Sequence, residues 1–133
     1  MKELSVEIIT PSSSVFRGKA KSVSVPGSLG NFQILYNHAP ILSSLDIGKI
    51  KIVDLDDKTI ELATSGGTVE VNNNNVLLVV DSAESKEDID IARAREAFNR
   101  AKERISSHKN DIDLSRAELA LQRALNRIKF VEN

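Results

Sequence analysis

The chain has 133 residues, no cysteine, two histidines and a formal net charge of −1. Its length allows one ordinary domain, or a small domain with an appendage, to bury a core without a metal or a disulfide. The composition excludes thiol chemistry, and the wide separation of His38 and His108 argues against a classical zinc site. The near-neutral charge argues against nucleic acid as the main partner. No run approaches the roughly 20 apolar residues of a membrane span, and the N-terminus lacks a signal peptide's apolar segment, so we expect a soluble protein of cytoplasmic origin.

Up to about residue 83, short runs alternate apolar and polar residues with a period of two, which is typical of half-buried strands. All three prolines and all six glycines lie in this part of the chain, at or before Gly67, and separate the runs as turn residues. This spacing predicts a β-sandwich or flattened barrel of about eight to ten strands. The predicted strands are centred on Leu4/Val6/Ile8, Val23/Val25, Ile50/Ile52, Ile60/Leu62 and Val69/Val71, and the last one runs over residues 75–80.

The sequence from residue 84 onward predicts two antiparallel helices, because two segments each carry one apolar seam at spacings of three and four. Ser85 with Asp88 resembles a capping box near the start of the first helix, and Asp111 or Asp113 is the expected N-cap of the second. The break at 106–111 holds no apolar residue, which predicts an αα-hairpin. The seams are Ile91, Ala94, Phe98, Ala101 and Ile105, and Leu114, Ala117, Leu121, Ala124 and Ile128.

Several seam positions are alanine, so the hairpin should bury little apolar area and open easily. The fold class predicted from all these patterns is α+β, mostly β. We expect the sandwich over residues 1–84 and the hairpin over residues 85–133.

Charge is distributed unevenly between these two parts. Residues 1–84 carry 7 Lys+Arg and 10 Asp+Glu, whereas residues 85–133 carry 11 and 9, including seven of the eight arginines. Because the guanidinium fork suits carboxylate or phosphate, this distribution indicates an anionic partner for the hairpin. A solvated helix face with pairs such as Glu96 and Arg100 explains the same charges at least as well.

The chain shows no catalytic motif. Gly48-Lys49 is not part of a phosphate-binding loop, and Gly27-Ser28-Leu29-Gly30 is not a nucleophile elbow, which requires Gly-x-Ser-x-Gly. The three acidic residues Asp54, Asp56 and Asp57 are interpreted as a solvated turn, because neither the glycine nor the distal glutamate of a calcium loop follows them. We interpret His38 as a hydrogen-bonding loop residue. The sequence therefore predicts a protein that is not an enzyme and has no metal site.

A polar stripe runs beside the seam of the first helix, and two arginines lie one turn apart on the second. If these arginines converge across the hairpin, they repel one another unless an acid or a bound anion compensates, and a polyphosphate would meet that need. The stripe consists of Asp90, Arg93, Ala97 and Arg100, and the second helix contributes Arg123 and Arg127.

Longer motifs are more specific than these periodicities. They are Thr10-Pro11, Gly30-Asn31-Phe32-Gln33-Ile34-Leu35 running into Asn37-His38-Ala39-Pro40, Ser65-Gly66-Gly67, and the segment from Arg116 to Arg127. With these motifs the chain resembles the epsilon subunit of bacterial F-type ATP synthase along its whole length. It departs from the usual pattern at Gln33, Tyr36 and Thr68.

The resemblance implies a non-catalytic rotor subunit with a ten-stranded sandwich that contacts the gamma subunit and the c-ring. It implies rotor contacts at Asn31, Phe32, His38 and Pro40. The hairpin would inhibit ATP hydrolysis by extending into the ring of alpha and beta subunits. The protein would be a monomer when isolated and peripheral at the cytoplasmic face of the bacterial cell membrane, held there only through the complex.

Some members of this family bind ATP on the folded hairpin through a motif of Ile or Leu, Asp, two free positions, Arg and Ala, which residues 89–94 fill completely. The resemblance thus implies ATP, with or without Mg²⁺, as a regulatory ligand and no catalytic cofactor. The alternative is a stand-alone protein-binding module in which a β-sandwich presents a helical hairpin. The implied ATP contacts are Glu84, Ile89, Asp90, Arg93, Ala94, Arg100, Arg123 and Arg127.

Overall fold

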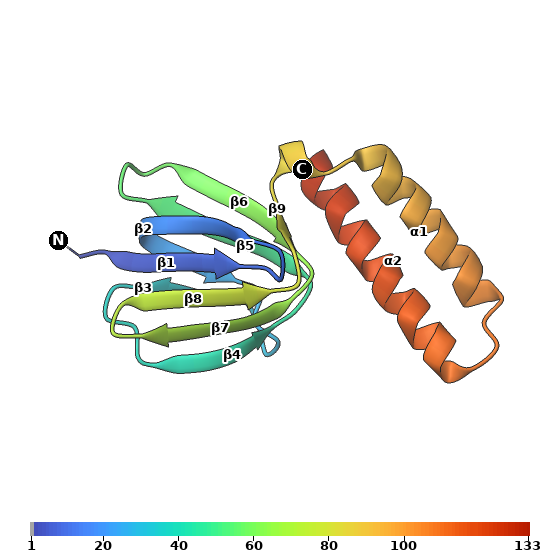
Figure 1. Ribbon diagram of the computed structural model, residues 1–133, viewed down its shortest axis with the longest axis horizontal. Helices are drawn as coiled ribbons and strands as arrows, with labels where there is room; N and C mark the ends of the chain where they lie inside the picture. The colour runs from blue at the N-terminus through green and yellow to red at the C-terminus, as the bar shows by residue number, and fades with distance from the viewer. Residues whose placement is uncertain (1) are drawn as a thin grey trace. The chain divides into compact units, whose positions relative to one another are not determined.

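A computed structural model describes residues 2–133. The chain divides into two compact units, of which the first ends at Ser85 and the second is Lys86–Asn133. Figure 1 shows the first unit as strands and the second as a pair of helices.

The first unit contains nine strands among its described residues. They are β1 (Leu4–Ile9), β2 (Ser14–Val25), β3 (Phe32–Leu35), β4 (Ile41–Leu45), β5 (Gly48–Asp54), β6 (Thr59–Thr64), β7 (Gly67–Asn72), β8 (Asn75–Val80) and β9 (Ala83–Glu84). The order in the sheet is β4-β7-β8-β1-β2-β5-β6-β9, with β3 on β2. Only β1 and β8 pair in parallel among these strands; the other pairs are antiparallel.

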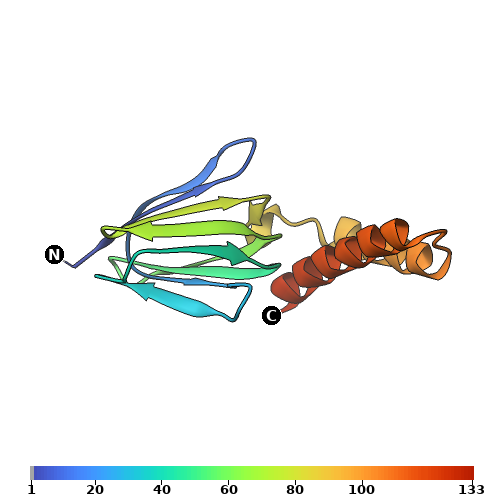
Figure 2. The same ribbon diagram turned by 90° about the horizontal axis from the view of Figure 1, so that it is seen from below.

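The long strand β2 joins the two layers of this unit. Its first part pairs with β1, and its second part pairs with β3 over residues 22–25 and with β5 over residues 20–24. Figures 1 and 2 show the strands arranged in two layers on either side of this connection. The predicted β-sandwich followed by a helical hairpin is confirmed. The count is nine rather than ten, because β2 runs through both layers as one unbroken strand.

A single apolar core lies between the layers. Every strand predicted from period-two alternation contributes to it, with Leu4, Ile8, Ile50 and Ile52 fully buried. The strand predicted around Val23 is much longer than expected, since β2 begins at Ser14. The strands β3 and β4 were not predicted.

The second unit is an antiparallel hairpin of α1 (Ile91–Ser106) and α2 (Asp111–Glu132), preceded by a short 3₁₀ turn, η1 (Lys86–Asp88). The seam is confirmed, with its alanines the most buried residues and its larger side chains only half-buried. This arrangement lets the two backbones approach closely. None of the helices in residues 2–133 is long and apolar enough to cross a membrane. The buried seam alanines are Ala94, Ala101, Ala117 and Ala124.

Both predicted helix starts are wrong by a few residues. The capping box at Ser85 does not begin an α-helix; residues 86–88 form the 3₁₀ turn, and the N-cap of α1 is Asp90. The N-cap of α2 is Asn110, whose side chain accepts a hydrogen bond from the Asp113 N–H at 2.9 Å, and not Asp111 or Asp113. Asparagine caps as well as aspartate does, and the two acids then lie in the first turn, where the helix dipole favours them.

Since the first unit closes its own core, a fragment ending at Ser85 is expected to fold without the helices. Its thermal unfolding should be a single cooperative transition, with circular dichroism and calorimetry giving the same midpoint. A fragment that melts without cooperativity would show that the two units share one folding core.

Candidate functional site

The motif at residues 89–94 coincides with the start of α1. The Asp90 carboxylate accepts a hydrogen bond from the Arg93 backbone N–H at 3.2 Å, so it caps the helix. Ile89 and Ala94 occupy the two positions that pack together in a hydrophobic staple, and both are buried. Three of the four specified positions in the motif therefore have a structural role in starting the helix. Only the Arg93 side chain, which is exposed, is free of such a role.

The predicted arginines differ in their environment. Within residues 2–133, neither Arg93 nor Arg123 forms an ion pair, and both side chains are exposed. Arg100 lies 4.0 Å from the Glu96 carboxylate one turn earlier, with both side chains largely exposed, so this pair contributes little stability. The predicted Glu96–Arg100 pair is thus confirmed. Arg127 is half-buried.

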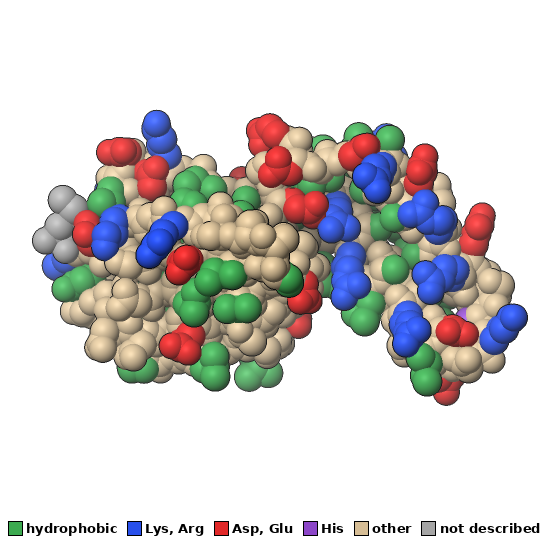
Figure 3. Space-filling view, in the orientation of Figure 1, with side chains coloured by type: hydrophobic (Ala, Val, Ile, Leu, Met, Phe, Trp, Pro, Cys, Tyr) green, Lys and Arg blue, Asp and Glu red, His purple; other side chains and the backbone are tan. Residues whose placement is uncertain are grey.

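Arg93 lies in the first turn of α1, Arg100 lies further along α1 toward the connecting turn, and Arg123 and Arg127 lie on the second half of α2. Because α1 and α2 run antiparallel, the beginning of α1 lies beside the end of α2, and an ion pair of 3.4 Å between Arg95 and Glu132 joins these ends. Figure 3 shows Lys and Arg side chains gathered over the two helices on the face in view. This part of the hairpin presents more cationic than anionic groups to solvent, as an anion-binding surface requires.

Glu84, the remaining predicted ATP contact, belongs to the first unit. It lies in the two-residue strand β9 and is half-buried. Its backbone pairs with Ala63 of β6. The role of all eight predicted ATP contacts stays a prediction.

The structure brings two of the four predicted rotor-contact residues together. The rings of Phe32 and His38 lie with their centroids 6.4 Å apart, and both residues are half-buried. His38 Nδ1 donates a hydrogen bond to the Ala39 carbonyl at 2.7 Å, which confirms its interpretation as a loop hydrogen-bonding residue. Asn31 and Pro40 are exposed.

Sequence reasoning missed a group of exposed apolar residues in this region. Five of the nine exposed large hydrophobic residues among residues 2–133 fall between positions 29 and 42. A signal for four of them exists in the sequence, since adjacent apolar pairs cannot both face the core of a strand. They lie in the stretch of sequence that also holds the four predicted rotor-contact residues. They are Leu29, Leu35, Tyr36, Ile41 and Leu42.

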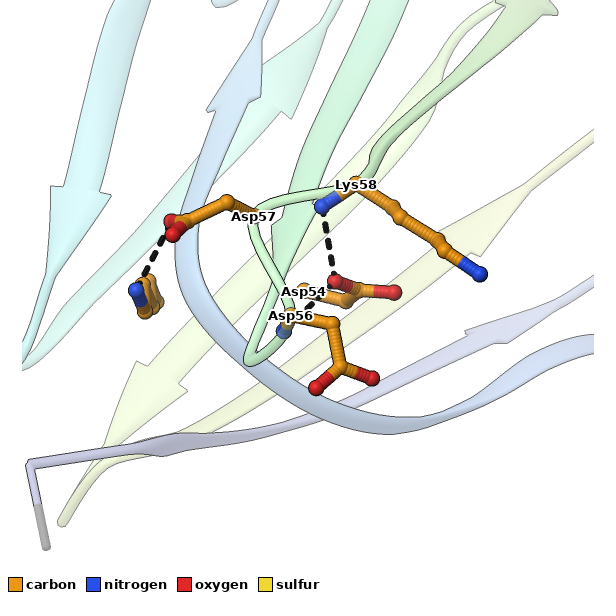
Figure 4. Close-up of polar contacts among 5 residues, drawn as sticks. Asp54, Asp56, Asp57 and Lys58 are labelled. Carbon is orange, nitrogen blue, oxygen red and sulfur yellow. Dashed lines mark hydrogen bonds and ion pairs between the residues drawn. The ribbon is translucent and has the colours of Figure 1, made fainter.

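The acidic turn between β5 and β6 organises its own backbone, as Figure 4 shows. Asp54 Oδ1 accepts hydrogen bonds from the N–H groups of Asp56 and Lys58, each at 2.9 Å. Asp57 has a φ of 62° and forms an ion pair of 2.7 Å with Lys21. The prediction of a solvated turn is confirmed, because the Asp54 carboxylate binds the backbone of the turn and the Asp57 carboxylate pairs with an exposed lysine.

A shallow hollow of about 390 Å³ lies over β1, β2 and β8. Its polar lining includes Ser5, Arg17, Lys19 and Asn75, and none of the predicted site residues belongs to it. The hollow therefore adds nothing to the candidate ATP site.

Comparison with known families matches both units. Residues 3–86 match the model of the ATP synthase delta/epsilon chain β-sandwich domain, and residues 87–132 match that of its long α-helix domain. A protein from Lactiplantibacillus plantarum named ATP synthase epsilon chain is 42% identical over 108 residues, covering 80% of this chain and 76% of that protein. A protein of the same name from Desulfitobacterium hafniense is 41% identical over 104 residues, with 78% of each chain covered.

Two solved structures share the fold. One is a chain of the Euglena gracilis mitochondrial ATP synthase, with a TM-score of 0.83 and 17% identity, covering 95% of this chain and 79% of that one. The other is a chain from the central stalk and c-ring of the Tetrahymena thermophila mitochondrial ATP synthase, with a TM-score of 0.60 and 15% identity, covering 99% and 95%.

Proposed function

The chain belongs to the ATP synthase delta/epsilon family, and on that premise we propose that it is a regulatory subunit in the central stalk of a bacterial F-type ATP synthase. It is an epsilon chain, a stalk subunit rather than a catalytic one. The observation that carries the proposal is the match of both units, over residues 3–86 and 87–132, to the two domains of one family. A stand-alone binding module would not require both matches.

The sandwich is the unit proposed to hold the protein in the rotor. Its exposed apolar residues between positions 29 and 42 favour contact with other subunits, for which the gamma subunit and the c-ring are the candidates. Asn31, Phe32, His38 and Pro40 lie in the same stretch of sequence. The protein would then be peripheral at the cytoplasmic face of the membrane, attached through the complex.

The hairpin is the unit proposed to inhibit ATP hydrolysis. Its seam buries alanines where a stable helix pair would bury leucines, so separating the helices exposes little apolar area. Its excess of basic residues suits an acidic surface on the ring of alpha and beta subunits. A hairpin that opens at low cost and carries cationic side chains can exchange a closed state for an extended, inhibitory one.

ATP is proposed to stabilise the closed state. Arg93 and Arg123 lack ion-pair partners within residues 2–133; Arg93 lies in the first turn of α1, and Arg123 lies on the second half of α2. A triphosphate that contacts both helices would neutralise arginine charges that lie near one another only when the hairpin is closed. ATP would therefore act as an allosteric ligand and not as a substrate of this chain.

Removal of residues 86–133 tests the inhibitory role. The fragment that ends at Ser85 keeps the proposed rotor contacts and lacks the helices, so an F1 complex reconstituted with it should hydrolyse ATP several-fold faster than one with the full chain. Steady-state hydrolysis at low and high ATP measures the effect.

The control is binding of the fragment to F1, which should equal that of the full chain. Equal hydrolysis rates at every ATP concentration, with binding preserved, would refute inhibition by this hairpin.

A further inference from the structure

The chain leaves the sandwich through residues 82–85, which are named the strap here. The strap follows β8 and contains β9, a strand of only two residues. Its ladder with β6 consists of two pairs, Ala63 with Glu84 and Thr64 with Ala83. Such a short ladder at the edge of a sheet gives little cooperative stability, so other contacts decide whether the strap stays docked.

A buried hydroxyl adds side-chain contacts to this short ladder. Thr64 is 2% exposed, and its Oγ1 donates a hydrogen bond to the Ser82 carbonyl at 2.8 Å. The same oxygen accepts a hydrogen bond from the Gly66 N–H at 3.2 Å. Beside it, the hydroxyls of Ser65 and Ser82 lie 2.7 Å apart. These contacts, named the polar lock here, join the strap to the turn between β6 and β7.

The turn on one side of the polar lock is rigidly held. Gly66 and Gly67 have φ angles of 107° and 154°, and a Cβ at Gly67 would lie 2.1 Å from the Val79 carbonyl oxygen, so the backbones are in close contact. The Gly66 carbonyl also accepts a hydrogen bond from the Asp81 N–H at 2.9 Å. On the strap side Ala83 packs against the edge of the apolar core, but all four residues 82–85 are only half-buried. Breaking the polar lock should therefore move the strap and leave the turn in place.

We propose that the strap is a detachable segment and that the polar lock controls its release. When docked, the strap fixes the point at which the tether of the helical unit begins. When released, its four residues add up to about 13 Å to the reach of that tether, since an extended chain spans roughly 3.3–3.6 Å per residue. Release of the strap would therefore extend the range over which the hairpin finds a partner.

The regulatory consequence rests on the function proposed above, whereas detachment of the strap is a property of the isolated chain. Hydrogen exchange of the full-length protein tests detachment directly. Thr64→Val keeps the shape of the side chain and removes both hydrogen bonds of its hydroxyl. The Ala83 and Glu84 amides should exchange about tenfold faster in this variant, while amides of β1 and β8 keep the wild-type rate.

Thr59→Val is the matched control, because Thr59 lies on the same strand and is exposed. It should leave exchange in the strap unchanged. Equal strap exchange in Thr64→Val and the wild type would overturn the proposal. Faster exchange throughout the sandwich in Thr64→Val would also overturn it, because the hydroxyl would then stabilise the whole unit.

A reversible cross-link tests the regulatory consequence. The chain contains no cysteine, and Ala63 and Glu84 are cross-strand partners, so Ala63→Cys with Glu84→Cys can form a single disulfide that holds the strap docked. Each preparation is its own control, since oxidised and reduced forms differ only in this bond. The oxidised form should inhibit ATP hydrolysis several-fold less than the reduced form. Equal inhibition by both forms, with complete cross-linking, would overturn the regulatory role of the strap.

The deletion variant ending at Ser85 separates this failure from failure of the proposed function. If that deletion raises hydrolysis and the cross-link does not, the hairpin inhibits without release of the strap. If the deletion has no effect, the inhibitory function itself fails. Detachment of the strap is then decided by the exchange measurement alone.

Discussion

Calorimetric titration of the isolated protein with ATP is expected to give saturable binding that disappears when Arg123 and Arg127 are both replaced by alanine. Both arginines lie on the second half of α2, where α2 runs beside the start of α1. Removing them takes two cations from one helix and leaves Arg93 and Arg100 on the other. Charge-assisted contacts to phosphate are among the strongest hydrogen bonds in proteins, so the loss of two should reduce affinity at least a hundredfold.

The fold should survive this double substitution. Arg123 is exposed and Arg127 is half-buried, and the fully buried seam residues of α2, Ala117 and Ala124, are unchanged. The matched control is Arg104→Ala with Arg116→Ala, which removes the same charge from exposed positions nearer the connecting turn. ATP binding should be intact in the control. Equal heats for both double variants would show that the predicted arginines only cover a solvated face.

Binding should also stabilise the closed hairpin by mass action. A ligand that binds only this state adds RT ln(1 + [L]/Kd), about 2.7 kcal/mol at a hundredfold excess over Kd. The wild-type melting temperature should therefore rise with ATP concentration, and that of the double variant should not. No detectable wild-type binding up to millimolar ATP would mean that the motif does not act as a sensor at cellular concentrations.

Whether a strand could be predicted from the sequence depends on how clearly its apolar and polar residues alternate. Strands with clear alternation, such as β1 with Leu4, Val6 and Ile8, are predicted because one face must be buried. The first part of β2 also alternates, but its inward positions include Gly18 and Ala20, which give no apolar signal. In β3 and β4 the alternation is broken by exposed apolar residues.

The helix starts were misplaced because several residues near each start can cap. Serine and aspartate side chains, as at Ser85 and Asp90, can both cap a helix by accepting a hydrogen bond from a backbone N–H, and the choice depends on where the buried seam begins. Ile89 and Ala94 are buried, which fixes the first helical turn after Asp90. For α2 the cap is Asn110, one residue before Asp111 and three before Asp113, the two acids that were expected to serve.

The residues of the candidate ATP site also differ in how far the sequence alone predicts their role. Ile89, Asp90 and Ala94 are constrained by the fold at the start of α1, but the helix pattern predicted only Ala94 as a seam residue and did not identify Asp90 as the cap. The Arg93 and Arg123 side chains are exposed, and from spacing alone a solvated face explains the arginines as well as a ligand does. Until ATP binding is measured, only the resemblance to a family favours an ATP site over a solvated helix face.

The closed hairpin should be destroyed by one substitution in its seam. Ala117 is 0% exposed and belongs to the row of buried alanines that lets α1 and α2 approach closely. Leucine at this position adds three carbon atoms where there is no space for them, and overpacking of this kind costs about 1–3 kcal/mol. A seam that buries mainly alanine has little stability to set against that cost, so Ala117→Leu should separate the helices.

The absence of cysteine makes this separation measurable. Spin labels on Lys102→Cys and Glu118→Cys, two exposed positions on the two helices, should report one short distance in the otherwise unchanged protein and a broad, longer distribution in Ala117→Leu. Ala92→Leu is the matched control, because Ala92 is exposed on α1 and leucine is as good a helix former there. It should leave the distance unchanged.

In the reconstituted enzyme Ala117→Leu should inhibit ATP hydrolysis more strongly than the wild type and should no longer respond to ATP, since the closed state that binds ATP is lost. An unchanged distance in Ala117→Leu would mean that the seam can accommodate leucine, and a separated hairpin without stronger inhibition would contradict the proposal that the open state is the inhibitory one.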